Sequence, residues 1–133
     1  MQRRGLAELR RVSFELAIAT KNPEAAKDFY SNVLELKLIE DSPFALVFDA
    51  NGTMLRIQKV QEFAPAKHTA LGWHVADIRS VIDDLIRKGV RFQRCEGLPQ
   101  DDLGIWRTLS GALIAWFCDR DGNILSITQF PSQ

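Results

Sequence analysis

Hydrophobic and polar residues follow a strand-like or a helix-like period in an order that occurs twice along the chain. In the first half, residues 14–19 alternate as a half-buried strand does. Apolar residues then recur at helical spacing over residues 25–34 and give the segment one apolar face. Three strand-like segments follow, at residues 36–40, 44–48 and 54–60. The first half therefore predicts the order strand, helix, strand, strand, strand.

The second half has the same order. Residues 68–75 form a strand-like segment, and Asp77 is placed to cap a helix that Gly89 ends. The following strands are expected at residues 90–94, 113–118 and 124–130.

The two halves also match residue by residue. Residues 48–58 align with residues 118–128 at an offset of 70, without a gap, so that Asp49 corresponds to Asp119. The earlier strands and helices match at an offset of about 55, which leaves about fifteen extra residues near residues 97–111. A long loop of this kind, with Trp106 in it, is expected to form a lid or an edge strand over a pocket. Two copies of one unit usually form a pseudo-twofold site between them.

The chain of 133 residues fits one compact domain with four parts. We expect an N-terminal extension at residues 1–11, a first module at 12–60, a linker at 61–67 and a second module at 68–133.

Charge and composition exclude several functions. Seventeen acidic residues balance seventeen basic ones, so no overall field favours nucleic acid or an anionic membrane as a partner. No segment approaches the ~20 apolar residues that span a bilayer, and no signal peptide is evident. Cys95 and Cys118 have the spacing of neither a zinc site nor a redox pair, and we expect both to be reduced in a cytoplasmic protein.

Two motifs in these modules resemble a known family. They are Asp-Phe-Tyr at residues 28–30, in the first helix, and Asp-x-Asp-Gly-Asn at residues 119–123, before the last strand. Together with residues 71–90, they resemble the vicinal-oxygen-chelate superfamily of glyoxalase I, extradiol dioxygenases and bleomycin-resistance proteins. The resemblance implies an α+β fold in which two βαβββ modules form a curved mixed sheet around a central cleft. It also implies a homodimer.

In the metal-using members of this family, four inward-facing histidines and glutamates ligate one divalent ion. The corresponding residues here are Glu15, Arg56, Ala70 and Ser126. Only Glu15 is a good ligand, because Arg56 is a permanent cation, Ala70 has no donor and Ser126 is a weak one. The sequence therefore predicts neither a metal nor another cofactor.

Two histidines leave an alternative open. His68 and His74 lie two residues before and four residues after Ala70, so strand alternation places them on its face. A displaced metal site would use Glu15 with these two histidines. In the simpler interpretation, His68 begins its strand exposed and His74 forms hydrogen bonds near the helix entry.

Glu15 and Arg56 are expected to form an ion pair if both project into the cleft. This pair is either purely structural or a polar anchor for a ligand, in which case Arg56 holds an anionic or carbonyl group. The other expected ligand-binding residues are Gln58, Ala70, Trp106, Trp116 and Ser126.

The predicted function is metal-independent binding of a small organic molecule in the cleft between the modules, as in the bleomycin-resistance branch. The pattern identifies no catalytic residue. One alternative is a metal-dependent lyase, isomerase or dioxygenase of the same superfamily with displaced ligands. Another is an interaction module whose cleft is filled by its own side chains.

Overall fold

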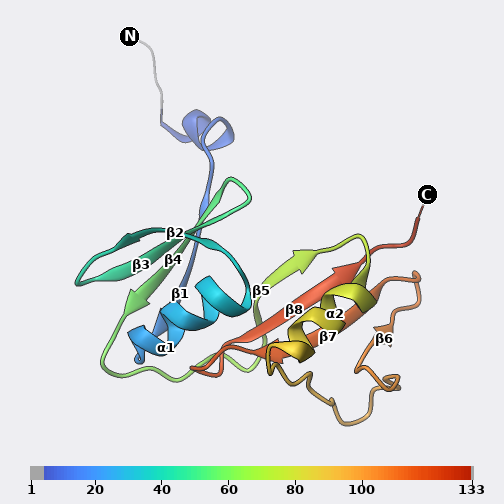
Figure 1. Ribbon diagram of the computed structural model, residues 1–133. Coiled ribbons are helices and arrows are strands. Elements are labelled where there is room, and N and C mark those ends of the chain that lie inside the picture. The colour runs from blue at the N-terminus through green and yellow to red at the C-terminus, as the bar shows by residue number, and fades with distance from the viewer. Residues whose placement is uncertain (1–4, 133) are drawn as a thin grey trace.

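The computed structural model describes residues 5–132, which form two βαβββ modules side by side (Figure 1). Each module has a four-stranded mixed sheet, with strand orders β1-β4-β3-β2 and β5-β8-β7-β6. This arrangement confirms the α+β fold expected from the sequence. The elements are η1 (Leu6–Arg10), β1 (Glu15–Thr20), α1 (Pro23–Asp28), η2 (Phe29–Val33), β2 (Lys37–Asp41), β3 (Ala45–Ala50), β4 (Thr53–Lys59), β5 (Thr69–His74), α2 (Ile78–Arg87), β6 (Trp106–Arg107), β7 (Leu113–Cys118) and β8 (Ile124–Gln129).

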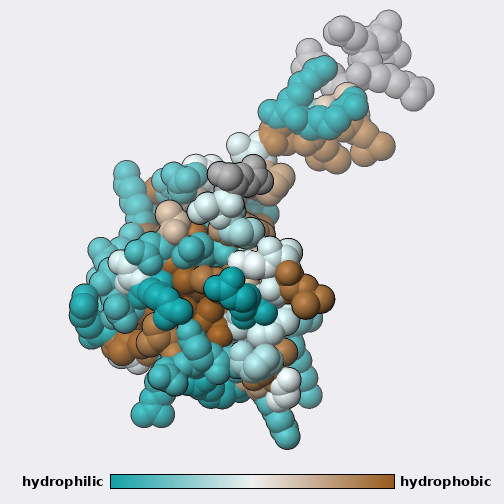
Figure 2. Space-filling view, turned by 90° about the vertical axis from the view of Figure 1, so that its right-hand side faces the viewer, coloured by the Kyte–Doolittle hydropathy of each residue, from teal (hydrophilic) through white to brown (hydrophobic). Residues whose placement is uncertain are grey.

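The N-terminal extension stands off from the two modules (Figures 1 and 2). Its short 3₁₀ helix η1 has no buried residue, and Leu6 and Leu9 are 83% and 68% exposed. Residues 1–4 of the predicted extension lie outside the described residues. Among the residues that are described, no helix is both long and apolar enough to span a membrane.

One strand was predicted wrongly. Residues 90–94 do not form a strand, and Phe92 makes only a single bridge to β7. The side chain of Gln100 explains the difference, because its amide donates to the carbonyl of Gln93 and accepts from the N–H of Cys95. These backbone groups are therefore satisfied inside the loop and need no neighbouring strand. The edge of the second sheet is formed instead by β6, in the long loop, as one of the two predictions for Trp106 allowed.

The first helix also departs from the regular pattern. It begins as α1 and continues as the π-helical turn η2, in which the N–H of Leu34 donates to the carbonyl of Phe29. Glu35 then has a φ of 59°, in the left-handed region where glycine is usual. Lys88 of the second module stabilises this turn, because its Nζ lies 2.6 Å from the Glu35 carboxylate.

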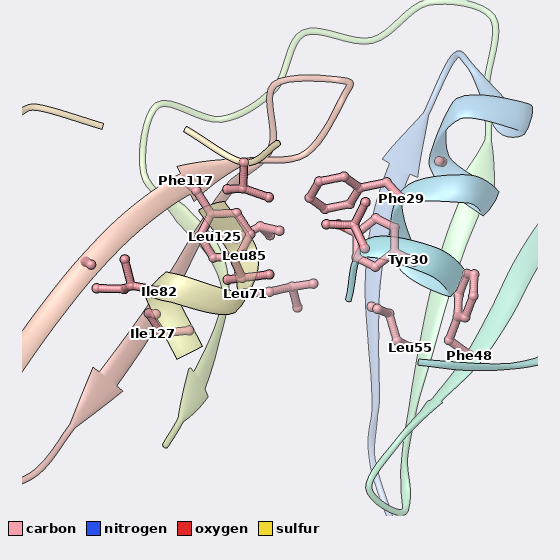
Figure 3. Packing of buried hydrophobic residues seen from close by; sticks show 14 of the residues in the cluster. Phe29, Tyr30, Phe48, Leu55, Leu71, Ile82, Leu85, Phe117, Leu125 and Ile127 are labelled. Carbon is pink, nitrogen blue, oxygen red and sulfur yellow. The ribbon is translucent and has the colours of Figure 1, made fainter. Parts of the chain in front are cut away.

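A single apolar core runs through both modules (Figure 3). The side chain of Phe29 points from the first module toward Phe117, and their ring centroids are 6.5 Å apart. Trp73 is partly buried and packs against this core. The sheet faces covered by the helices, represented by Ile57 and Leu125, are thus buried, whereas the opposite faces are largely open to solvent.

The modules are joined by the carboxylate of Asp119, in the hairpin between β7 and β8. Asp119 is 7% exposed and accepts hydrogen bonds from the Tyr30 hydroxyl at 2.8 Å and from Asn123 Nδ2 at 2.9 Å. Its other oxygen accepts from the N–H groups of Asp121 and Asn123. Burial of Tyr30, followed by the nearby Asp119 charge, raises the pKa of its phenol far above the usual value. The hydroxyl therefore remains a donor.

The same hairpin makes further contacts with the first module. The carboxylate of Asp121 accepts from the Thr20 hydroxyl and, at 3.0 Å, from the N–H of Lys21. Arg120 donates to Asp28 at 2.6 Å, and its guanidinium lies 5.8 Å from the centre of the Phe29 ring. We call residues 119–123 the docking hairpin.

The docking hairpin yields a stability prediction with an internal control. Tyr30→Phe removes one donor to a buried carboxylate, and we expect it to lower the free energy of unfolding by about 1–2 kcal/mol in urea titrations. Asp119→Ala removes the acceptor of all four hydrogen bonds and should cost more. Asp49→Ala is the matched control, because Asp49 occupies the same hairpin position in the first module but is exposed. Equal losses for Asp49→Ala and Asp119→Ala would contradict the assigned role.

The long loop that carries Trp106 is organised by Asp101. Burial acts to raise the pKa of this carboxyl, but the N–H groups of Ile105 and Leu103 and the charge of Arg79 outweigh it and hold the pKa below its usual value. The folded state therefore favours ionised Asp101. Its stabilising contribution is present above the unfolded-state pKa and is lost as the pH falls through the folded-state pKa.

We therefore expect Asp101→Asn to lower the urea midpoint at pH 7 and this difference to shrink as the pH is lowered below about 4. Asp102→Asn is the matched control, because the Asp102 side chain makes no hydrogen bond to any described residue. A difference that stays constant with pH would show that the charge of Asp101 does not contribute.

Candidate functional site

The open face of the first sheet carries the charged pair predicted from the sequence. Glu15 and Ala17 point to this face from β1, and Arg56 lies between Ala17 and Val47 in the strand register. Arg56 Nε is 3.4 Å from Glu15 Oε1, so the expected ion pair is present. Both side chains are more than a third exposed, and the pair therefore contributes little to stability in a single chain.

Arg56 retains donors for another partner. Its contact with Glu15 uses Nε alone, and no oxygen in residues 5–132 accepts from its two terminal amino groups. A guanidinium presents these groups as a planar fork that matches two oxygens of a carboxylate or phosphate. The Arg56 side chain is 36% exposed, and its neighbours in the sheet register are Ala17 and Val47, which have no charged or polar side-chain group to compete for the fork.

The open face of the second sheet has Ser126 near its centre. In the strand register Ser126 lies between Gly72 on β5 and Trp116 on β7. A Cβ atom on residue 72 would lie 2.6 Å from the Ser126 hydroxyl oxygen, closer than van der Waals contact permits. The Ser126 hydroxyl can occupy this position only because residue 72 is a glycine and has no Cβ atom.

Two tryptophans form a wall beside Ser126. The indole rings of Trp106 and Trp116 are stacked, with centroids 6.2 Å apart and planes inclined by 27°. The Nε1 of Trp116 donates to the hydroxyl of Thr69 at 3.2 Å, which fixes the ring across the open face. Both indoles are half-buried, so part of each ring remains accessible. We call this pair the tryptophan shelf.

Ala70 does not occupy a regular strand position. Thr69 pairs with Ile124 and Leu71 pairs with Leu125, so Ala70 is the extra residue of a β-bulge. Ala70 was expected at one of the four family positions that face the cleft. The bulge takes it out of the strand register, and Gly72 is the residue that pairs with Ser126. The importance of Gly72 and Thr69 was not predicted. A glycine inside a strand was the one signal in the sequence that pointed to such a site.

The two histidines do not gather around Glu15. His68 is exposed, and its Nδ1 lies 3.2 Å from the carbonyl oxygen of the adjacent Thr69. His74 stacks edge-on against Phe130, with ring centroids 4.7 Å apart. In the described part of the chain, no group of three or more His, Cys, Asp or Glu side chains is placed to hold a metal ion.

The donor set at the four family positions does not fit a divalent ion. Glu15 already lies against the permanent positive charge of Arg56, which repels a second cation. On the second sheet, the corresponding face offers a glycine, an alanine and one hydroxyl, which are poor ligands for such an ion.

The predicted site residues are divided between two surfaces. Glu15, Arg56 and Gln58 belong to the first sheet, and Ser126 and the tryptophan shelf belong to the second. None of these predicted site residues lines the four concave regions described for the single chain, although Gly72 lines one of them. The most apolar of these regions, of about 260 Å³, lies on the helix side between the modules and includes Leu36, Trp73 and Val81.

Comparison with solved structures shows the same fold. Lactoylglutathione lyase from Agrobacterium tumefaciens is 16% identical, with a TM-score of 0.70 over 89% of this chain and 92% of that one. A glyoxalase/bleomycin resistance protein/dioxygenase from Alicyclobacillus acidocaldarius is 20% identical, with a TM-score of 0.69 over 91% and 92% of the two chains. TnmS3, an antibiotic binding protein from Streptomyces sp. CB03234, is 22% identical, with a TM-score of 0.66 over 90% and 95%. No curated protein matches the sequence.

A family model matches residues 13–127, which include nearly all of both modules. The match agrees with the paired βαβββ modules and with the docking hairpin, which contains the Asp-x-Asp-Gly-Asn motif. The chain belongs to the Glyoxalase/Bleomycin resistance protein/Dioxygenase superfamily.

Proposed function

We propose that this protein binds a small organic molecule without a metal ion. The binding cleft forms where the open face of a first sheet meets the open face of a second sheet. The observation that carries this proposal is the ion pair of Glu15 and Arg56 at two positions where metal-using relatives have ligands. An arginine there supplies hydrogen-bond donors and a fixed positive charge, which suit an anionic or carbonyl group.

A homodimer would complete this cleft. In the single chain β1 and β5 are both edge strands, and the sheet faces beside them are open. Leu16 and Met54, at the β1 edge, are 40% and 42% exposed, more than is usual for large apolar residues in a sheet. In a twofold-symmetric dimer, the second sheet of each chain would cover the first sheet of the other, and the same surface would be buried at two equivalent places.

Each predicted residue then has a role in this cleft. Arg56 holds the polar group of the ligand, Glu15 orients the guanidinium, and Gln58 extends the polar surface along β4. The partner chain supplies its Ser126, the small residues around Ala70, and the tryptophan shelf as an apolar wall. We also propose a cytoplasmic location for the protein, with Cys95 and Cys118 as free thiols.

Metal content separates binding from the enzymatic alternative. Protein purified without chelator should contain well below one divalent ion per chain in elemental analysis and native mass spectrometry, because Arg56 occupies a ligand position. A stoichiometric ion would contradict the proposal. It would favour a displaced-ligand enzyme if turnover of the methylglyoxal–glutathione adduct were also lost in His68→Ala and Glu15→Ala.

Light scattering during gel filtration tests the dimer. We expect a mass of two chains of 15.1 kDa each. Phe14→Asp should shift the protein toward the monomer, because Phe14 directly precedes β1 and is 77% exposed. Phe44→Asp is the matched control, since Phe44 is 80% exposed but belongs to the loop between β2 and β3. A monomeric wild-type protein at micromolar concentration would contradict this part of the proposal.

A further inference from the structure

We infer that the ligand of this cleft is a planar aromatic molecule that carries a carboxylate or a similar anionic group. The inference rests on the proposed function and adds the chemical class of the ligand. Three features of the open faces support it: the tryptophan shelf, the Ser126 hydroxyl, and the free donors of Arg56.

The tryptophan shelf selects for flat rings. Trp106 and Trp116 are held in nearly parallel planes, and the hydrogen bond from Trp116 to Thr69 restrains the second ring. An indole with a fixed orientation stacks on another aromatic ring at little further cost in side-chain entropy. A saturated ring of the same size presents no flat face to this surface and gains less from it.

Ser126 supplies a polar contact beside the shelf. The residue as a whole is only 8% exposed, its hydroxyl makes no hydrogen bond to any residue from 5 to 132, and the hydroxyl oxygen itself is not sealed from solvent. This hydroxyl oxygen lies over the space left by Gly72 and next to Trp116 in the register. A hydroxyl that is open to solvent and has no protein partner is available to a ligand atom that can donate or accept a hydrogen bond at the ring edge.

Arg56 supplies the charge that selects for an anion. Its single contact with Glu15 is long, at 3.4 Å, and its terminal amino groups remain free among the described residues. A ligand carboxylate can form two parallel hydrogen bonds with these groups. The charge of Glu15 opposes such a ligand, so its removal should strengthen the binding of an anion. A cationic ligand bound through the Glu15 carboxylate would instead bind more weakly once that carboxylate was removed.

Isothermal titration calorimetry with four matched probes tests the inference on the full chain. The probes are 2-naphthoate, 2-naphthalenemethanol, 2-naphthylmethylammonium and cyclohexanecarboxylate. They separate the contribution of the flat ring from that of the negative charge. We expect 2-naphthoate to bind most tightly of the four.

Variants assign the binding to the named groups. Arg56→Gln should weaken 2-naphthoate about tenfold or more and change 2-naphthalenemethanol by less than about threefold. Glu15→Gln should strengthen 2-naphthoate, whereas Trp116→Leu should weaken both naphthalene probes. Gly72→Ala should weaken the binding of 2-naphthoate, because a Cβ there displaces the Ser126 hydroxyl.

Arg91→Gln and Phe44→Leu are controls, because both residues are exposed and lie outside the site. Circular dichroism and urea midpoints of every variant show whether it is folded.

The outcomes distinguish this inference from the proposed function. Tighter binding of the ammonium or the alcohol, lost in Trp116→Leu, would overturn the anionic class and leave metal-independent binding intact. Equal affinity for 2-naphthoate and cyclohexanecarboxylate would overturn the aromatic class. Binding of none of the four probes would also overturn the inference. A stoichiometric metal ion needed for binding would instead overturn the proposed function.

Discussion

The two modules keep one arrangement because the buried Asp119 carboxylate needs donors from both. Two of its hydrogen bonds come from the backbone of its own hairpin, and a third comes from Tyr30 in the other module. A buried carboxylate that loses such partners is costly, so the hairpin cannot leave the first module without a large penalty. Arg120 and Asp121, the next two residues of the hairpin, also bind the first module, at Asp28 and Lys21. The directions in which both open sheet faces point follow from this junction.

The repeat does not make the junction symmetric. At the helix offset of 55 residues, Tyr30 corresponds to Leu85, and at the hairpin offset of 70, Asp119 corresponds to Asp49. Leucine has no hydroxyl, so the second possible junction lacks its donor. Within residues 5–132, the Asp49 carboxylate accepts only from the N–H of Gly52 in its own turn. The polar junction at the docking hairpin is therefore not repeated, and Lys88 adds a separate polar contact between the modules at Glu35. On the other side an apolar hollow of about 200 Å³, with Leu16 and Leu71 in its lining, remains open.

The sequence predicted the parts of the fold that depend on periodicity and turn chemistry. Asp77 caps α2 as expected, by accepting from the N–H of Ser80, and Asn51 and Gly52 have the positive φ values of a tight hairpin turn. It did not predict the bulge at Ala70 or the loss of the strand at residues 90–94, because bonds between individual side chains and the backbone, such as those of Gln100, leave no periodic signal. The pairing of Glu15 with Arg56 was predictable, since it needed only strand register. The Ser126–Gly72 contact was not, because it depends on the bulge.

In the proposed cleft, an arginine at a position that the family resemblance matches to a metal ligand changes what can bind. A divalent ion held by carboxylates and imidazoles attracts oxygen ligands through charge and accepts several of them at once. A guanidinium also attracts oxygens, but only through N–H groups that point outward in one plane. Because it is large and always positively charged, it does not share a site with a metal ion. With Glu15 beside it, the pair has no net charge, so a ligand must supply a group that Arg56 prefers to its long contact with Glu15. Two oxygens in one plane meet that requirement better than one, and the geometry of the pair therefore favours a carboxylate over a lone carbonyl.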